Sequence, residues 1–358
     1  MVEIEREDRI YKDLAQHLDK LPGGFGSQDS TVERRLLKRL FTLEEAELAI
    51  HLNIEREDAA AIAARAGLRA EVAERRLTEM AQKGLILSVT AEDGTLRYEA
   101  VPWVVGIYEF QIGRLDDELL KDIDDYWRTR KPSDRPSGPQ MRTIPIGESI
   151  DIRLEVLPYE NVDALIAAED RFAVAPCICR HTAKMHGGGC DAPEETCLSF
   201  GDFADYYVRT GRGRAIDRDE VAEILARADA ANLVLQPSNS KEAAFICCCC
   251  GCCCGILQGI KRHPKPSDVV VNAFIAQLDP ELCQNCKTCL ERCQMEALTA
   301  GEDHVFLNTD RCIGCGLCVS TCPTEALTLV RKPDRPGLEP PRTFEDAWRT
   351  AMEAQDTR

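Results

Sequence analysis

Cys283-Gln-Asn-Cys286-Lys-Thr-Cys289-Leu-Glu-Arg-Cys293 is the stretch of this sequence that decides the fold around it. Its C-x2-C-x2-C-x3-C spacing returns 29 residues later as Cys312-Ile-Gly-Cys315-Gly-Leu-Cys318-Val-Ser-Thr-Cys322. The residues that follow also repeat, because Glu296-Ala-Leu298 matches Glu325-Ala-Leu327 at the same offset. The two stretches are therefore copies of one duplicated unit.

This duplicated pattern resembles the bacterial two-cluster ferredoxin over residues 275–332. In that family three thiolates of each loop reach three corners of a 4Fe–4S cubane, and the fourth cysteine serves the neighbouring cluster. The resemblance implies two clusters with crossed ligands. The first would be held by Cys283, Cys286, Cys289 and Cys322, and the second by Cys312, Cys315, Cys318 and Cys293.

Residues between and after the ligands complete the pattern in the second copy. Gly314 and Gly316 would let backbone N–H groups approach the sulfurs, and Pro323 follows the last cysteine. The first copy departs from this pattern with Asn285 and Lys287 at the glycine positions, and Gln294 stands where proline is usual. We expect intact ligation with different potentials for the two clusters. The alternative, two zinc sites, is disfavoured because tetrathiolate zinc normally uses two separated C-x2-C pairs.

Eleven further cysteines lie in the middle of the chain. They are Cys177, Cys179, Cys190 and Cys197, then Cys247, Cys248, Cys249 and Cys250, and finally Cys252, Cys253 and Cys254. The motifs at 176–180 (Pro-Cys-x-Cys-Arg) and 249–255 (Cys-Cys-Gly-Cys-Cys-Cys-Gly) resemble those of multi-cluster ferredoxin-like proteins of anaerobes. That resemblance implies electron transfer.

Seven cysteines in the eight positions from 247 to 254 cannot all bind one four-coordinate centre, because neighbouring side chains diverge. We expect one further 4Fe–4S cluster here, with two as the alternative. All of the central cysteines except Cys248 are candidate ligands. A structural zinc ion, reduced buried thiols and the non-cubane cluster of heterodisulfide reductases remain open as alternatives.

Charged residues lie among these cysteines. His181 and His186 are expected to be solvated or to lie behind the ligands, with histidine ligation as the alternative. Arg180 either has a charge role, in which it neutralises a cluster or binds an anionic partner, or is a solvated loop residue. Gly187-Gly-Gly189 lacks the Lys-Ser/Thr of a phosphate loop and would let the backbone fold tightly around Cys190.

The first hundred residues contain no cysteine and have the pattern of helices followed by a hairpin. We expect helical segments over 32–40, 46–50, 57–66 and 71–83, and strands over 85–89 and 96–100. This order resembles the winged helix-turn-helix fold over residues 31–100. Residues 31–100 contain 11 basic and 13 acidic residues, so the module lacks the positive face that duplex DNA requires. We expect it to dock a partner or form a homodimer.

The central region is expected to mix strands and helices around the cysteine loops. Strands are predicted at 142–146, 150–156, 172–175 and 233–235, with helices at 160–168 and 217–231. Pro-rich stretches at 131–139 and 263–267 are typical of linkers, and 343–354 is predicted to be helical.

The fold class is therefore α+β and multidomain: a helical winged-helix-like N-terminal domain, a Cys-rich α+β central domain and a C-terminal two-cluster ferredoxin fold. The predicted domains are 1–100 (docking), 101–140 (helix and linker), 141–266 (Cys-rich), 267–332 (ferredoxin) and 333–358 (tail).

Composition narrows the cellular setting. The 358 residues include 44 basic and 61 acidic side chains, giving a net charge of −17, which disfavours nucleic acid and anionic lipid as partners. The N-terminus has no signal-peptide pattern, and the apolar run at 245–260 is too short to span a membrane, so we expect a cytoplasmic protein. In that reducing compartment the 19 cysteines are expected to bind metal rather than to form disulfides.

The resulting expectation is an iron–sulfur protein that passes single electrons to or from a partner redox protein. No catalytic residue is identified in the sequence. One alternative is an iron–sulfur reductase with a substrate-binding cluster in the central domain. The other is a redox-responsive transcription regulator, in which clusters control the winged helix.

Overall fold

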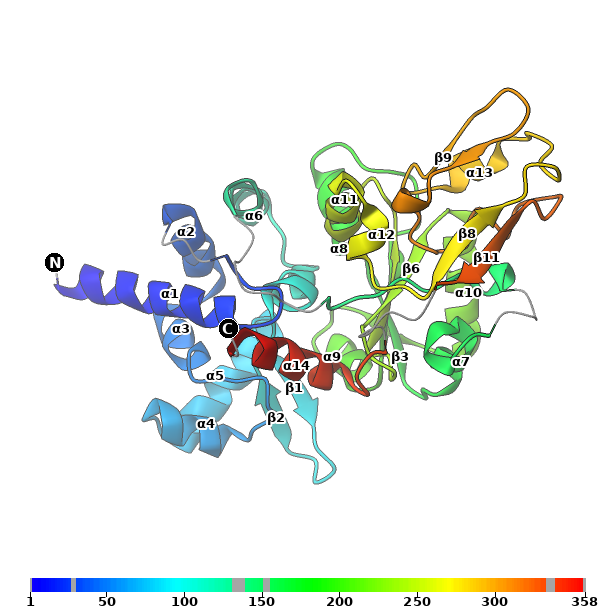
Figure 1. Cartoon of the computed structure of the whole chain (residues 1–358). Coiled ribbons are helices and arrows are strands. Elements are labelled where there is room, and N and C mark those ends of the chain that lie inside the picture. Colours follow the sequence, from blue (N-terminus) through cyan, green and yellow to red (C-terminus); the bar gives the residue numbers. More distant parts are fainter. Residues whose placement is uncertain (1, 27–29, 131–138, 151–154, 333–338, 357–358) are drawn as a thin grey trace. The chain divides into compact units, whose positions relative to one another are not determined.

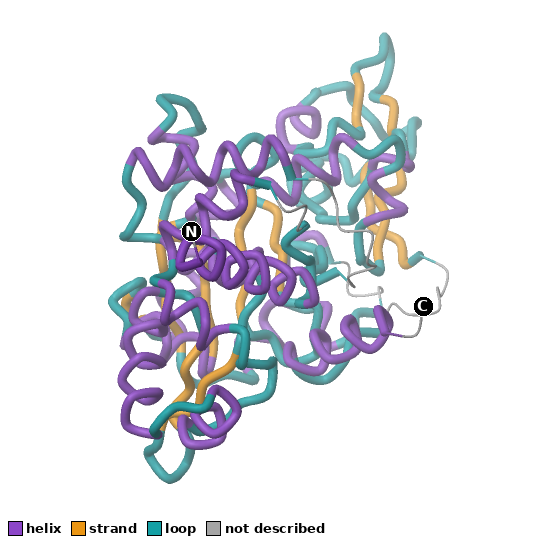
Figure 2. Tube along the Cα trace, turned by 90° about the vertical axis from the view of Figure 1, so that its left-hand side faces the viewer, coloured by secondary structure: helices purple, strands orange, loops and turns teal. Residues whose placement is uncertain are grey.

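A computed structural model describes residues 2–26, 30–130, 139–150, 155–332 and 339–356. Most of the predicted linker at 131–139 and of the strand at 150–156 lies outside these ranges. The chain forms two compact units (Figure 1). Unit 1 consists of 1–140, 205–212 and 345–358, and unit 2 consists of 141–204 and 213–344. The described chain contains both helices and strands (Figure 2), which confirms a mixed helix and sheet fold.

Unit 1 is mainly helical. Its elements are α1 (Val2–Lys20), α2 (Thr31–Leu40), α3 (Leu43–Ala49), α4 (Ala59–Ala66), α5 (Ala70–Lys83), β1 (Leu87–Thr90), β2 (Leu96–Glu99) and α6 (Asp117–Thr129). The strands β1 and β2 form an antiparallel hairpin, as predicted. Helices α4 and α5 end at Gly67 and Gly84, whose left-handed backbone is the usual helix C-cap. The winged-helix resemblance itself stays a prediction.

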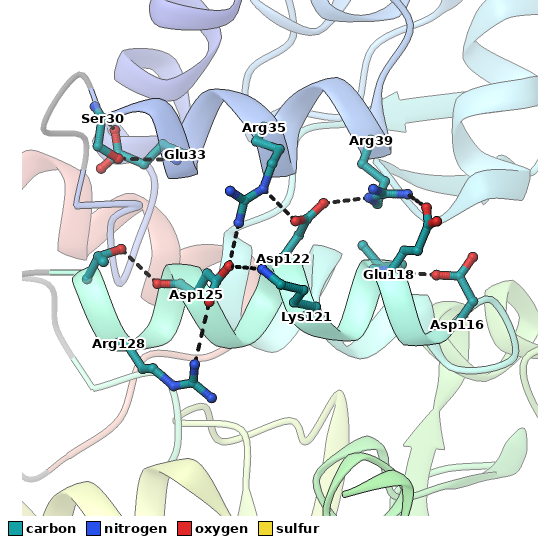
Figure 3. A network of polar contacts seen from close by, with 12 residues as sticks. Ser30, Glu33, Arg35, Arg39, Asp116, Glu118, Lys121, Asp122, Asp125 and Arg128 are labelled. Atoms are coloured by element: carbon teal, nitrogen blue, oxygen red, sulfur yellow. Dashed lines mark hydrogen bonds and ion pairs between the residues drawn. The ribbon is translucent and has the colours of Figure 1, made fainter.

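A buried carboxylate joins α2 to α6 (Figure 3). Asp122 on α6 accepts hydrogen bonds from Arg35 Nε at 2.6 Å and Arg39 Nε at 2.5 Å. Its side chain is only 4 % exposed, whereas both arginines are partly exposed. Asp125, one helical turn further, contacts Arg35 and Lys121 closer to the surface. Because ion pairs contribute more when their partners are withdrawn from water, Asp122 should dominate this contact.

We therefore expect Asp122→Ala to lower the free energy of unfolding of unit 1 by about 2 kcal/mol, since two charge-assisted hydrogen bonds are lost. Asp125→Ala, the matched control on the same helix, should cost less than about 1 kcal/mol. All three tryptophans of the sequence (Trp103, Trp127 and Trp348) lie in unit 1. Urea unfolding followed by tryptophan fluorescence therefore reports on this unit, and equal effects of the two variants would contradict the expectation.

Unit 2 is built on a five-stranded antiparallel sheet of order β5-β3-β4-β7-β6. Its strands are β3 (Phe172–Pro176), β4 (Glu195–Phe200), β5 (Arg214–Ile216), β6 (Val234–Pro237) and β7 (Phe245–Cys249). The helices of this part are α7 (Val162–Ala167), α8 (Ile178–Met185), α10 (Arg218–Ala230), α11 (Gly255–Arg262) and α12 (Pro266–Val269). Asp217 is the N-cap of α10, because its side chain accepts a hydrogen bond from the Glu220 amide.

Two short ladders complete unit 2. The first pairs β8 (Phe274–Leu278) with β11 (Leu327–Arg331), and the second pairs β9 (Leu298–Thr299) with β10 (Phe306–Leu307). Helix α13 (Thr288–Arg292) lies between β8 and β9 in the chain. Helices α9 (Gly201–Arg209) and α14 (Phe344–Asp356) begin in unit 2 and continue into unit 1.

One face of the large sheet is apolar. Val174, Leu198 and Ile246 are neighbours across β3, β4 and β7, and all three are buried. Side chains alternate between the two faces of a strand, so Cys248 shares this apolar face, while Cys247 and Cys249 point to the other. Cys248 is 2 % exposed and packs in the hydrophobic core.

Candidate metal centres

The duplicated motif is also a duplication of backbone conformation. Gly314 and Gly316 have φ of 68° and 76°, and Asn285 and Lys287, at the equivalent positions of the first copy, have φ of 51° and 65°. Left-handed backbone is natural for glycine, tolerable for asparagine and uncommon for lysine. The first copy therefore keeps the loop shape of the second without its glycines.

Two cavities separate the eight cysteines into quartets. One cavity is lined by Cys293, Cys312, Cys315 and Cys318. A second is lined by Cys283, Cys286, Cys289 and Cys322. Each quartet takes three cysteines from one motif and the last cysteine from the other. These are the two sets that the ferredoxin resemblance implies.

The quartets differ in their surroundings. Burial raises the pKa of Cys315 to about 12 and that of Cys289 to about 11. Cys286 is exposed, and a hydrogen bond from the Thr288 amide lowers its pKa. The Ala297 amide donates to Cys293 Sγ at 3.2 Å and the Ala276 amide to Cys312 Sγ at 3.4 Å. Such N–H groups favour thiolates and metal-bound sulfur.

Gly316 is closely surrounded by neighbouring atoms. A Cβ atom there would come within 2.1 Å of Ser149 Oγ, and its φ of +76° would strain any other residue. Gly187, which lies after α8 in the same unit, has φ of +72° but nothing within 4 Å of such a Cβ. Alanine variants of Gly316 and Gly187 therefore separate the cost of left-handed backbone strain from the cost of a steric clash.

We expect Gly316→Ala to cost about 2–4 kcal/mol, combining left-handed strain with overpacking. Gly187→Ala should cost only the strain, about 1 kcal/mol. Amide hydrogen exchange over 312–322 measures the effect of Gly316→Ala. A decrease of about 2 kcal/mol in local stability corresponds to roughly 30-fold faster exchange. Unchanged exchange over 312–322 in Gly316→Ala would show that Ser149 does not confine this loop.

The eleven central cysteines fall into three groups in the structure. The sheet-face thiols are Cys177, Cys179, Cys197, Cys247, Cys249 and Cys254. The turn thiols are Cys190, Cys250, Cys252 and Cys253. Cys248 faces the apolar core and belongs to neither set.

The sheet-face thiols form one continuous chain of contacts. Cys177 contacts Cys179, Cys179 contacts Cys254, Cys254 contacts Cys249, Cys249 contacts Cys247, and Cys247 contacts Cys197. The register explains part of this arrangement, since Cys197 on β4 lies opposite Cys247 on β7. Contacts with the Cys247 and Cys254 thiols lower the pKa of Cys249 to about 7.

Two helices begin at this chain of thiols. Cys177 is the N-cap of α8 and Cys254 is the N-cap of α11, each without a side-chain cap hydrogen bond. The first turn of a helix has free N–H groups and a partial positive charge, which favours thiolates. The sheet face and the two helix starts together make a site suited to several anionic sulfurs.

The turn thiols lie closer together. Their four Sγ atoms are all within 4.8 Å of one another. Cys190 Sγ is 3.7 Å from Cys250 Sγ and 3.9 Å from Cys253 Sγ, and Cys252 Sγ is 3.7 Å from Cys253 Sγ. The turn after β7 is closed by a hydrogen bond from the Cys254 amide to the Cys250 carbonyl at 3.1 Å.

Arg180 lies between the two sets and is 1 % exposed. Its guanidinium donates to the Cys248 carbonyl at 3.1 Å, to the Thr196 hydroxyl and to Cys250 Sγ at 3.8 Å. Burial opposes the charge of Arg180, but the Cys177 and Cys250 sulfurs outweigh it and raise the pKa of the guanidinium. The same group helps to lower the pKa of Cys250 to about 7 against the effect of burial. Arg180 is therefore not the solvated loop residue that was one of the two expectations.

The histidines contribute no ligand to the turn thiols. His181 Nδ1 lies 3.7 Å from a Glu194 carboxylate oxygen, and its side chain is 40 % exposed. Gly187 and Gly189 have left-handed φ values of 72° and 97°, so the chain turns sharply before Cys190. This is the tight turn that the glycine run predicts.

The duplicated segment and the thiol turn touch directly. The Gly251 amide donates to Gln294 Oε1 at 2.7 Å, and a Cβ on Gly251 would lie 2.7 Å from the Gln294 carbonyl oxygen. Gln294 thus has a structural role at the position where proline is usual. The hydrophobic core continues across this contact, since Cys250 and Cys254 share it with Ile313 and Leu317.

Sequence reasoning missed three features of this region: the division of the central thiols, the burial of Arg180 and the Gln294 contact. The sequence-based candidate ligands already leave out Cys248, and alternation along β7 places it on the opposite face from Cys247 and Cys249. No sequence signal places Cys190 beside Cys250, 60 residues later in the chain.

Comparison with known proteins supports the C-terminal assignment. Residues 276–329 match the family profile of the 4Fe-4S dicluster domain. No curated protein and no solved structure matches the chain. Among the described residues, no helix combines the length and apolarity needed to cross a membrane. The C-terminal part of the chain therefore carries a ferredoxin-type iron–sulfur domain.

Proposed function

We propose that this protein is an electron-transfer protein in which two ferredoxin-type 4Fe–4S clusters and one further cluster serve a partner redox protein. The observation that carries the proposal is the sorting of the eight C-terminal cysteines into two cavities, each lined by four thiols. When bound there, 4Fe–4S clusters supply reversible one-electron transfer.

The residues present fit this cofactor. Each cavity offers four sulfurs, and the Ala276 and Ala297 amides hydrogen-bond to sulfur in the first. Apolar side chains such as Leu298, Leu317 and Leu329 line the remainder and keep water away. The supporting groups tune potential and access, which is the contribution that a protein makes to an electron-transfer centre.

The further cluster is assigned to four of the six sheet-face thiols. Cys197, Cys247 and Cys249 lie on one face of the sheet. Cys177 and Cys254 begin two helices, where sulfur anions are favoured. Cys247, Cys249 and Cys254 share a continuous core with Cys293 and Cys315 of the first cavity. A contact such as Gly251 with Gln294 keeps the two regions together. Such proximity within one compact unit suits electron exchange between centres.

The first test is the iron and acid-labile sulfide content of the full chain, purified without oxygen. Three cubane clusters require about twelve of each per chain. A value of about eight of each would restrict the clusters to the duplicated segment and contradict the third one. Replacing four sheet-face thiols together by alanine should then lower the content by about four of each.

A second experiment tests the crossed ligand sets with pairs of alanine variants. Cys293→Ala combined with Cys315→Ala removes ligands from one cavity, so about four irons should be lost. Cys293→Ala combined with Cys286→Ala affects both cavities, so about eight should be lost. Cys248→Ala, outside every set, is the control. If the first double variant lost about eight irons and the second about four, each motif would instead bind one cluster with its own four cysteines.

Unit 1 is proposed as the docking module for a redox partner or a second copy of the chain. Helix α5, which would be the recognition helix of a winged helix, carries Glu71, Glu74 and Glu79 against its basic residues. One of these basic residues, Lys83, is paired with Glu45 at 2.6 Å. A protein partner fits this mixed surface better than the phosphates of a duplex.

A further inference from the structure

We propose that the four turn thiols, Cys190, Cys250, Cys252 and Cys253, bind one zinc ion as a tetrahedral tetrathiolate site. This inference goes beyond the electron-transfer function, because zinc has no redox chemistry. It assigns four of the sequence-based cluster ligands to a different metal. It also does not depend on the number of iron–sulfur clusters elsewhere in the chain.

The spacing of the sulfurs carries the proposal. A zinc–sulfur bond of about 2.3 Å places tetrahedral ligands about 3.8 Å from one another. Three of the separations here are 3.7, 3.7 and 3.9 Å, and all four atoms lie within 4.8 Å of one another. A disulfide would need about 2.05 Å.

The ferredoxin quartets of the same chain provide a comparison for the sulfur–sulfur distances of the turn thiols. A cubane distributes its four thiolates over four iron atoms, so those sulfurs lie further apart than sulfurs around one ion. Among the described residues, the turn thiols are the one group of three or more potential ligands whose donor atoms all lie within 4.8 Å. The ferredoxin quartets are more open, as cubane ligands should be.

Charge is a second, independent argument. Arg180 is almost completely buried, and its hydrogen-bond partners are a carbonyl, a hydroxyl and Cys250 Sγ, with no carboxylate among them. A buried cation is costly unless an anion compensates it. Four thiolates around Zn²⁺ carry a net charge of −2, so this site supplies an anion in direct contact with Arg180.

The ligand set indicates a structural ion. Four protein thiols fill the coordination shell of zinc and leave no position for water or substrate. Cys190 follows α8, whereas the other three lie in the turn after β7, so the ion would tie together segments 60 residues apart. The tied turn also holds Gly251, which contacts Gln294.

The experiment uses the full chain, purified without oxygen and without added zinc. We expect about one zinc per chain by plasma mass spectrometry, and zinc-edge X-ray absorption should show four sulfurs at about 2.3 Å. The zinc edge is element-specific, so iron–sulfur clusters do not obscure it. Absence of zinc, or a shell with nitrogen or oxygen, would overturn the proposal.

Variants then locate the ion. Cys252→Ala and Cys190→Ala, from separate segments, should each reduce bound zinc at least tenfold while iron and sulfide stay unchanged. Cys248→Ala is the matched control, since this neighbouring cysteine faces the core, and it should keep its zinc. A loss of about four irons and four sulfides in Cys252→Ala would instead show a cubane. Zinc retained in both turn variants would also overturn the assignment.

Discussion

The central region is organised around Arg180, a buried positive charge among cysteine thiols. Its guanidinium lies between the sheet-face thiols and the turn thiols and is held by a carbonyl, a hydroxyl and the Cys250 sulfur. Neutral thiols would leave this charge uncompensated in a medium of low dielectric constant. Metal binding at the proposed central sites would remove the thiol protons and provide the anions. Under that proposal the packing around Arg180 depends on thiolates, and folding and metal loading should be coupled.

In the duplicated segment, the first copy keeps the left-handed loop backbone of the second although it lacks the glycines that favour this conformation. Asn285 and Lys287 adopt the left-handed backbone of Gly314 and Gly316, and Glu296 and Glu325 do so as a second matched pair. Asn285 gains compensation, since its side-chain amide donates to the carbonyl oxygens of Gly301 and Glu302. The position of each thiol is set by the turn, so a costly side chain is accepted where the turn must be kept.

Local signals predicted much of the fold. Gly67 and Gly84 end helices because a left-handed residue closes a helix, and the Asp93-Gly94 turn closes the hairpin of β1 and β2. The two ferredoxin quartets are what the family resemblance implies, and the two cavities group the same cysteines. Helix α1 was not singled out by its sequence. The central thiols could not be sorted from the sequence, because their sets depend on strand register and on a contact between distant segments.

The order in which the three segments of unit 1 occur in the sequence has a consequence for its folding during synthesis. This unit includes 205–212 and 345–358 as well as 1–140. Tyr206 donates to the Ala81 carbonyl at 2.9 Å, Arg212 to the Phe110 carbonyl at 2.6 Å, and Arg349 pairs with Glu55 at 3.0 Å. On the ribosome, the first 140 residues emerge long before these partners, whereas unit 2 is complete at Phe344. A fragment cut at residue 140 would therefore lack two segments that stabilise unit 1.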